Sequence, residues 1–249
     1  MKLGFYSNWY MMASTIKKKF NRITIDNLEN FREGVLRWYR VKGRHDLPWK
    51  NPPTPYRVWI SEIMLRQTQV DTVKPYFARF MARFPEVATL AQASLDQVMA
   101  LWSGLGYYRR AKHLHSAAQM ILVDFLGVIP RRLEELQSLP GIGRTTAAAI
   151  ASLAYGEFEA ILDANVKRVL QRYFDGAASF NKADLWLLAE AALSKVDSAA
   201  YNQGMMDLGA TICVAKRPRC LDCPLQLHCV FFRLQGERGV SAGEVPAVE

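Results

Sequence analysis

The stretch from Leu139 to Ile150, LPGIGRTTAAAI, restricts the possible folds of this chain more than any other feature of its sequence. Leucines spaced three residues apart predict a short helix over 133–139, which Pro140 would end. The sequence Gly-Ile-Gly is typical of a tight turn, and the alanine-rich residues 144–155 predict a second helix. We therefore expect two helices joined by a very short connection.

Two glycines of this turn, Gly141 and Gly143, permit positive φ and carry no Cβ atom, so that another backbone or a phosphate can approach closely. The N–H groups at the start of the second helix favour an anion, and Arg144 adds positive charge there. An ordinary tight hairpin whose glycines serve packing is the alternative. The pattern is typical of the helix-hairpin-helix motif, which binds the DNA backbone without reading its sequence.

The formal net charge of the chain is +9, which indicates a partner that carries negative charge, most often a nucleic acid. A solvated basic surface is the alternative. The sequence contains no apolar run of transmembrane length and no signal-peptide pattern. We therefore expect a soluble intracellular protein, cytoplasmic or associated with the nucleoid, that does not interact with membranes.

Helical periodicity dominates the rest of the chain. Leu28, Phe31 and Val35 recur three and four residues apart, and similar stripes follow over 73–80, 107–126 and 201–212, whereas strand-like alternation is weak. Residues 94–97 have the form of a capping box, which begins a helix. The fold class predicted is all-α. At the two ends we expect an N-terminal arm over 1–25 and a flexible tail over 235–249.

The four cysteines of the chain lie in one short segment with the spacing C-x6-C-x2-C-x5-C, at Cys213, Cys220, Cys223 and Cys229. Four clustered thiolates suit a tetrahedral zinc ion or a 4Fe–4S cluster. A single C-x2-C pair flanked by longer loops favours the 4Fe–4S cluster, and zinc stays the alternative. We expect the bound group to have a structural role beside a basic loop, VAKRPR.

Two carboxylates stand out by their surroundings. Glu62 lies in the apolar stretch VWISEIMLRQTQV on a predicted helix, where a raised pKa would suit a general acid. The alternative is a surface glutamate paired with Arg66 four residues on. Asp163 lies in ILDANVKRVL at the expected start of a helix, where it could be a plain N-cap. An ionised aspartate there could also stabilise a developing positive charge.

Together these features resemble the endonuclease III superfamily of DNA glycosylases, and among them most of all the MutY-type adenine DNA glycosylases. The matching stretches lie within 28–232 and include LPW, SEIMLRQTQV, LWSGLGYY, LPGIGRTTAAAI, LDANVKRVL, NQGMMDLGA and the cysteine loop. The resemblance implies two helical lobes with a DNA cleft between them. A six-helix barrel over 51–159 would carry the hairpin, and a lobe made of 26–50 and 160–234 would hold the 4Fe–4S cluster.

The same resemblance implies catalytic roles for three residues, acting on a nucleotide that is flipped out of the duplex. Glu62 would protonate adenine at N7 and then help to activate water. Asp163 would stabilise the oxocarbenium-like sugar, and Asn165 would orient these groups.

Residues that bind DNA or the target base are also implied by the resemblance. Gln67 and Tyr107 would wedge into the duplex, Tyr107 beside the opposite guanine, and Trp49 and Asp207 would contribute to an adenine pocket. Packing is the alternative for each of them. The complete predicted set is Trp49, Gln67, Thr68, Tyr107, Gly141, Gly143, Arg144, Thr145 and Asp207.

Thr145 bears on the chemistry, because in endonuclease III-type members the matching residue is a lysine that attacks the sugar. Threonine carries no amine, so we expect water to be the nucleophile and base removal to stop at the abasic site. The predicted function is a monofunctional, monomeric glycosylase that removes adenine mispaired with 8-oxoguanine or guanine in double-stranded DNA.

Other functions compatible with the sequence remain open. Arg66 and Ala164 replace a glutamine and a glycine that are usual in adenine glycosylases, which favours a thymine/uracil glycosylase acting on G:T and G:U mismatches. A non-catalytic helix-hairpin-helix DNA-binding module is a third possibility. The sequence ends soon after the cysteine loop, without the further C-terminal domain of typical adenine glycosylases, and we expect a short form or a part of a longer protein.

Overall fold

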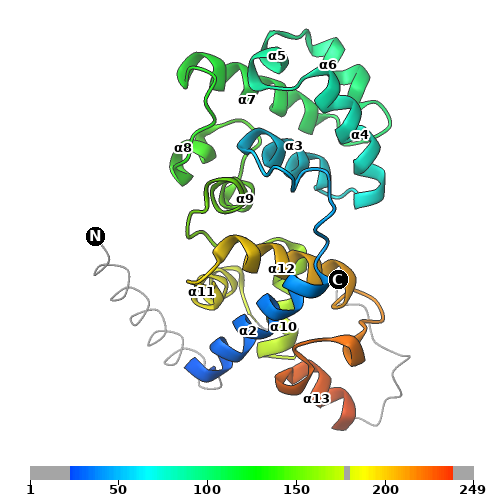
Figure 1. The fold of residues 1–249 in the computed structure, drawn as a ribbon, viewed down its shortest axis with the longest axis vertical. Coiled ribbons are helices and arrows are strands. Elements are labelled where there is room, and N and C mark those ends of the chain that lie inside the picture. The colour runs from blue at the N-terminus through cyan, green and yellow to red at the C-terminus, as the bar shows by residue number, and fades with distance from the viewer. Residues whose placement is uncertain (1–22, 177–179, 238–249) are drawn as a thin grey trace. The chain divides into compact units, whose positions relative to one another are not determined.

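The computed structural model describes residues 23–176 and 180–237 of this chain (Figure 1). In those residues it contains twelve α-helices, two short 3-10 helices and no strand, which confirms the predicted all-α class. None of the helices described is both long and apolar enough to cross a membrane. The predicted arm and tail lie outside the described residues, apart from their inner ends at 23–25 and 235–237.

The chain divides into two compact units, and each is described by itself. The hairpin unit comprises residues 45–157, and the cysteine unit comprises residues 23–44, 158–176 and 180–237. The helices of the hairpin unit are α3 (Pro55–Leu65), α4 (Val70–Arg83), α5 (Val87–Gln92), α6 (Leu95–Trp102), α7 (Arg109–Asp124), α8 (Leu133–Ser138) and α9 (Arg144–Tyr155). Within it α3 packs against α4, α7 and α9.

Local sequence signals set several helix ends of the hairpin unit. The predicted capping box begins α6, where Ser94 Oγ accepts a hydrogen bond from the Gln97 N–H at 3.2 Å. The helix predicted over 107–126 is shorter than expected and spans Arg109–Asp124. It starts later because Tyr107 has a φ of 50°, which a right-handed helix does not accommodate. It ends where the Gly127 N–H donates to the Ile121 carbonyl at 2.9 Å.

The predicted helical hairpin is present as α8 and α9, with α9 running from Arg144 to Tyr155. Gly141 has a φ of 77°, and a Cβ atom there would lie 2.7 Å from the Cβ of His113, so the position requires glycine. Gly143 does not use the positive φ that glycine permits: its φ is −92°, an extended conformation open to any residue. A Cβ at Gly143 would meet no atom within 4 Å, so the space beside this residue is open and the packing does not require glycine there.

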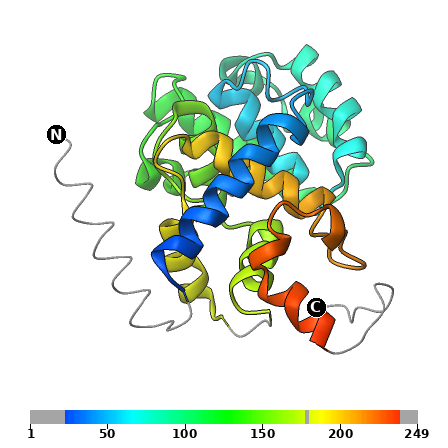
Figure 2. The same cartoon turned by 60° about the horizontal axis from the view of Figure 1, so that its bottom comes forward.

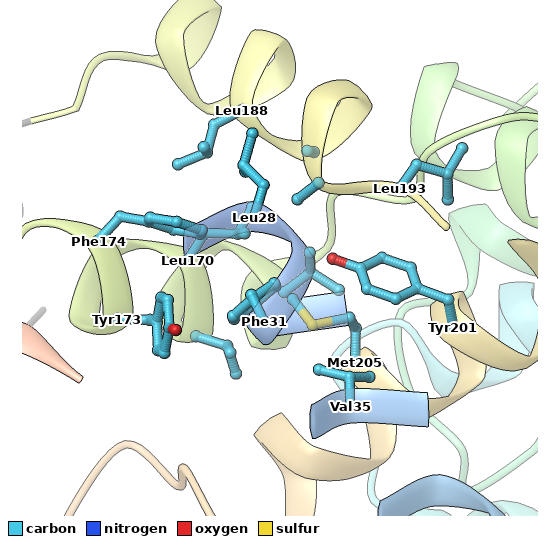
Figure 3. Close-up of a cluster of buried hydrophobic side chains, with 14 of the residues drawn as sticks. Leu28, Phe31, Val35, Leu170, Tyr173, Phe174, Leu188, Leu193, Tyr201 and Met205 are labelled. Carbon is cyan, nitrogen blue, oxygen red and sulfur yellow. The ribbon is translucent and has the colours of Figure 1, made fainter. Parts of the chain in front are cut away.

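The cysteine unit is built around α2. Its elements are α2 (Ile25–Lys42), α10 (Ala164–Phe174), α11 (Lys182–Ala192), α12 (Ser198–Thr211), η1 (Cys220–Asp222), η2 (Gln226–His228) and α13 (Val230–Glu237). Figure 3 shows Phe31 of α2 among apolar side chains from α10 and α12. Its ring centroid lies 4.6 Å from that of Tyr173 and 5.1 Å from that of Phe174. The predicted stripe on α2 is therefore the core of this unit, and α13 packs beside α10 (Figure 2).

Candidate active site

Asp163 is the N-cap of α10. Its Oδ1 accepts a hydrogen bond from the Val166 N–H at 2.7 Å, and its Oδ2 accepts one from Asn165 Nδ2 at 3.4 Å. The interpretation of Asp163 as an N-cap is thus confirmed. The helix cap occupies Oδ1 of the carboxylate. The catalytic role predicted for Asp163 stays a prediction.

Burial of the Asp163 carboxyl group raises its pKa above the ordinary value of 3.8. The residue as a whole is only half-buried, and its carboxyl group is the enclosed part. Hydrogen bonds from Val166 and Asn165 and the charge of Arg168 act in the opposite direction and lower the pKa. Burial therefore works against the ionised form that the predicted mechanism requires, and these three neighbours favour it.

Arg168, one turn along α10, holds the amide of Asn165. Its Nη2 donates to Asn165 Oδ1 at 2.8 Å and to the Gly209 carbonyl at 2.6 Å. Its Nε donates to the Cys213 carbonyl at 2.7 Å. The amide oxygen of Asn165 is thereby occupied, and its NH₂ group faces Asp163. Arg168 is not among the site residues predicted from the sequence, although its place three residues after Asn165 on a predicted helix was a usable signal.

Glu62 lies in α3 of the hairpin unit, half-buried between the buried residues Ser61 and Ile63. The alternative prediction paired it with Arg66 on the same helix. Arg66 follows as the C-cap residue of α3, which ends at Leu65, and the pairing stays a prediction. The Arg66 guanidinium donates to the Gly141 carbonyl at 3.2 Å and so connects the exit of α3 to the hairpin.

The two predicted wedge residues share an unusual backbone. Gln67 has a φ of 60° and Tyr107 a φ of 50°, and both side chains are exposed, Tyr107 to 59%. Non-glycine residues in this region store about 1–3 kcal/mol of strain each, and such strain is concentrated at functional sites. The neighbouring Thr68 is half-buried, and its Oγ1 accepts from Arg110 Nη2 at 3.2 Å.

The two residues assigned to an adenine pocket are buried in separate units. Trp49 is 5% exposed, and its ring packs edge-on against Phe77 with 5.5 Å between centroids. Asp207, on α12, is 1% exposed and accepts from the backbone N–H, Nε and Nη2 of Arg44 at 2.9, 2.8 and 2.6 Å. Each residue thus has a structural role in its own unit, and the pocket role of each stays a prediction.

An Arg44→Met variant is expected to lower the free energy of unfolding by about 3 kcal/mol, because the Asp207 carboxylate stays buried without its guanidinium. Urea denaturation measures this change. Arg40→Met, at an exposed position of α2, is the matched control and should change stability by about 0.5 kcal/mol or less. Equal losses in the two variants would show that the ion pair does not stabilise the fold.

The hairpin residues are placed as the sequence predicted. Arg144 is exposed in the first turn of α9, and Thr145 beside it is half-buried. Gly143 is the N-cap of this helix, and no side chain covers its Cα. The bare backbone and the positive charge therefore occur together at one helix start.

The four cysteines are half-buried and lie within reach of one another's charge. Burial, with a smaller contribution from the neighbouring thiols, raises the pKa of Cys223 to about 12 and that of Cys229 to about 11. In the described residues no three His, Cys, Asp or Glu side chains are arranged to hold a metal ion. Arg172 fixes the start of this loop by donating to the carbonyls of Val214 at 2.7 Å and Ala215 at 2.9 Å.

The helical hairpin, in an all-helical fold with a basic sequence, defines a helix-hairpin-helix protein of the kind that binds nucleic acid. Residues 60–184 match the HhH-GPD superfamily of base excision DNA repair proteins, and the chain belongs to this superfamily. A structure of a non-covalent endonuclease III–DNA complex has the same fold, with a TM-score of 0.75 at 20% identity over 86% of this chain and 99% of that one.

Two further proteins are similar to this chain in sequence. The adenine DNA glycosylase of Buchnera aphidicola subsp. Schizaphis graminum is 45% identical over 207 residues, which is 82% of this chain and 60% of that protein. A thermostable thymine-DNA glycosylase is 30% identical, with a TM-score of 0.78 over 84% of this chain and 98% of that one. The chain spans about 60% of the length of the first curated relatives that it matches.

Proposed function

We propose that this protein is a base-excision-repair glycosylase that removes adenine mispaired with guanine or 8-oxoguanine from double-stranded DNA. The observation that carries the choice of base is the 45% identity to an adenine DNA glycosylase, against 30% to the thymine-DNA glycosylase. The arrangement of Asp163, Asn165 and Arg168 supports a hydrolytic site, because it presents a carboxylate held by defined hydrogen bonds.

In the proposed reaction Glu62 gives a proton to N7 of the flipped adenine, and the bonding electrons of the glycosidic bond leave with the base. Asp163 stabilises the positive charge that develops on the sugar, while Asn165 keeps the carboxylate oriented. Water then adds to the sugar carbon and loses a proton to the Glu62 carboxylate. The products are free adenine and an abasic site in an intact strand.

Thr145 supports the hydrolytic route in this proposal. It lies in the first turn of α9. By the resemblance described above, endonuclease III-type members carry a lysine at the matching position, and its amine is their nucleophile. A hydroxyl group cannot form a Schiff base with the sugar, so strand cleavage should require added alkali. A covalent complex trapped by borohydride would contradict this assignment.

Binding of the DNA backbone is assigned to the hairpin. Gly141, Gly143 and Arg144 would contact phosphate without reading sequence, and Gln67, Thr68 and Tyr107 would contact the duplex at the mismatch. The six-helix barrel over 51–159, the cluster lobe formed by 26–50 and 160–234, and a DNA cleft between the lobes remain part of the proposal. Within residues 45–157 there are seven α-helices, two of them six residues long.

A 4Fe–4S cluster bound by Cys213, Cys220, Cys223 and Cys229 is the cofactor we propose. Thiols are the donor type that such a cluster takes, and a bound cationic core would favour the thiolates that burial disfavours. In the described residues no three of these side chains are arranged around one ion, so the support comes from the donor type and not from the geometry. When bound, the cluster would cross-link the segment 213–229. It is given no step in base removal.

The purified protein is expected to be brown and to contain iron and inorganic sulfide, which elemental analysis and visible absorption measure. Cys223→Ala should lower the iron content and the melting temperature, because it removes one of the four proposed ligands. Leu227→Ala, at an exposed position of the same loop, is the control and should leave both unchanged. One zinc ion per chain without iron would contradict the cluster assignment.

One panel of duplexes tests the proposed function. It contains adenine opposite 8-oxoguanine, adenine opposite guanine, thymine opposite guanine and uracil opposite guanine, and base loss is scored with and without alkali. We expect release of adenine from the first two duplexes and strand breaks only after alkali. Release of thymine and uracil alone would contradict the proposal.

A second candidate is a thymine/uracil glycosylase on mispairs with guanine. It is favoured by the thymine-DNA glycosylase structure, which this chain matches over 98% of that protein's length. The same panel decides between the two bases. Binding to every duplex without base loss would favour the third possibility, a non-catalytic DNA-binding module.

A further inference from the structure

Arg110, in the first turn of α7, has contacts that the proposed reaction does not use. Its Nη1 donates to three carbonyl oxygens at the exit of α3: those of Ile63 at 3.0 Å, Met64 at 2.8 Å and Arg66 at 2.6 Å. The carbonyls in the last turn of a helix have no intrahelical partner. Arg110 thus caps the C-terminal end of α3 from a different helix.

The other terminal nitrogen of Arg110 connects two loops. Its Nη2 donates to Thr68 Oγ1 at 3.2 Å, to the Leu105 carbonyl at 3.3 Å and to the Gly106 carbonyl at 3.2 Å. The guanidinium carbon also lies 5.2 Å from the ring centroid of Tyr107. One planar group therefore bonds to the loop after α3 and to the loop before α7.

These contacts flank both of the strained residues. The Arg66 carbonyl and the Thr68 hydroxyl lie on either side of Gln67, whose φ is 60°. The Gly106 carbonyl and the ring contact lie at Tyr107, whose φ is 50°. Backbone strain of this kind persists only where surrounding contacts hold it in place.

The guanidinium is half-buried, and burial lowers its pKa, with the nearby charge of Arg66 lowering it further. The charged guanidinium of Arg110 therefore lies where burial and the positive charge of Arg66 both disfavour it. A lysine would keep the charge, but it lacks the planar fork that reaches acceptors on two sides. The planar geometry of the guanidinium, rather than its charge alone, explains why an arginine and not a lysine makes these contacts at position 110.

We infer that Arg110 is a positioning residue that couples the loops 66–68 and 105–107, so that Gln67 and Tyr107 enter the duplex at the mismatch as one unit. The inference rests on the proposed function for the identity of the DNA that these loops contact. It assigns to Arg110 no contact with the substrate. Its effect on base removal passes through the two exposed side chains.

A double-mutant cycle on binding tests the coupling. The affinities of the wild type, Gln67→Ala, Tyr107→Ala and the double variant are measured for a duplex that carries an abasic-site analogue opposite guanine. We expect the double variant to lose less affinity than the product of the single losses, by about fivefold, because either substitution disables the joint insertion. Multiplicative losses within about twofold would overturn the inference.

The same cycle is repeated in an Arg110→Lys background, with Arg109→Met as the matched control. Arg109 is an exposed neighbour whose substitution removes one positive charge. We expect the coupling to disappear in Arg110→Lys and to persist in Arg109→Met. Coupling that survives in Arg110→Lys, or is lost in Arg109→Met, would contradict a role for the fork geometry.

Thermal melting shows whether Arg110→Lys is folded. If it is not, multiplicative losses in the native Arg110 background still overturn the inference, since both substituted side chains are exposed. Base release by the wild type is scored separately on the duplex panel. Because binding to the abasic analogue needs no catalysis, failure of the proposed function and failure of the coupling are read independently.

Discussion

An Asp163→Asn variant is expected to release adenine about 100- to 1000-fold more slowly than the wild type, because the charge that stabilises the sugar cation is lost. The variant should fold normally. Asparagine is as good an N-cap as aspartate, so the hydrogen bond from the Val166 N–H can be kept. Single-turnover base release on the preferred duplex measures the effect.

The difference in stability between Asp163→Asn and the wild type should depend on pH in a defined direction. Burial raises the pKa of Asp163 in the folded protein, so the folded state holds this proton more tightly than the unfolded chain does. The carboxylate therefore costs stability as pH rises above its unfolded pKa of about 3.9, and the cost is absent below it. The stability of Asp163→Asn relative to the wild type should rise from acidic to neutral pH.

Asp197→Asn is the matched control for both measurements. Asp197 is an exposed N-cap in the same unit, where it accepts from the Ala200 N–H at 2.9 Å. This variant should keep full base release. An Asp163→Asn variant that is as active as Asp197→Asn would show that Asp163 is only a cap, and the proposed mechanism would then be wrong.

A Glu62→Gln variant is expected to lower the rate of base release by about 100- to 10,000-fold, because glutamine cannot give a proton to the departing base. The substitution keeps the size of a half-buried side chain in α3, so the melting temperature should change little. Binding to the abasic-analogue duplex should also be preserved, which places the loss in the chemical step. Glu33→Gln, at an exposed position of α2, is the control.

The outcome that contradicts this assignment is a Glu62→Gln variant with near-native base release and normal DNA binding. A variant that releases base slowly only because it binds DNA weakly would also contradict it. Rates measured with saturating enzyme separate the two cases. The expected result is a slow rate that does not recover as the enzyme concentration is raised.

Local sequence patterns were sufficient to predict the hairpin and several of the other helices. The spacing of Leu28, Phe31 and Val35 is a property of one segment, and α2 buries these side chains as predicted. The capping box before α6 and the bounds of α9 follow from hydrogen bonds and backbone geometry within a few residues. Asp163 was recognised as a helix start for the same reason.

Backbone conformation was predicted less well wherever it depends on distant contacts. The glycines of the hairpin look equivalent in sequence, yet only Gly141 has a positive φ, and His113 of α7 leaves no room for a Cβ atom there. The helix expected from residue 107 starts at Arg109 because Tyr107 is held in a left-handed conformation. A periodic pattern carries no information about such constraints.

The sequence by itself determined the helical class, the hairpin, the four-thiol segment and the residue types available for chemistry, because each is encoded in residues close along the chain. Only the tertiary structure decided which arginines organise the candidate site. Arg44 binds Asp207 across 163 positions, and Arg110 binds the exit of α3 across more than 40. The physical reason is that a guanidinium bonds to whatever carbonyl or carboxylate the fold brings near, and no local pattern specifies that partner.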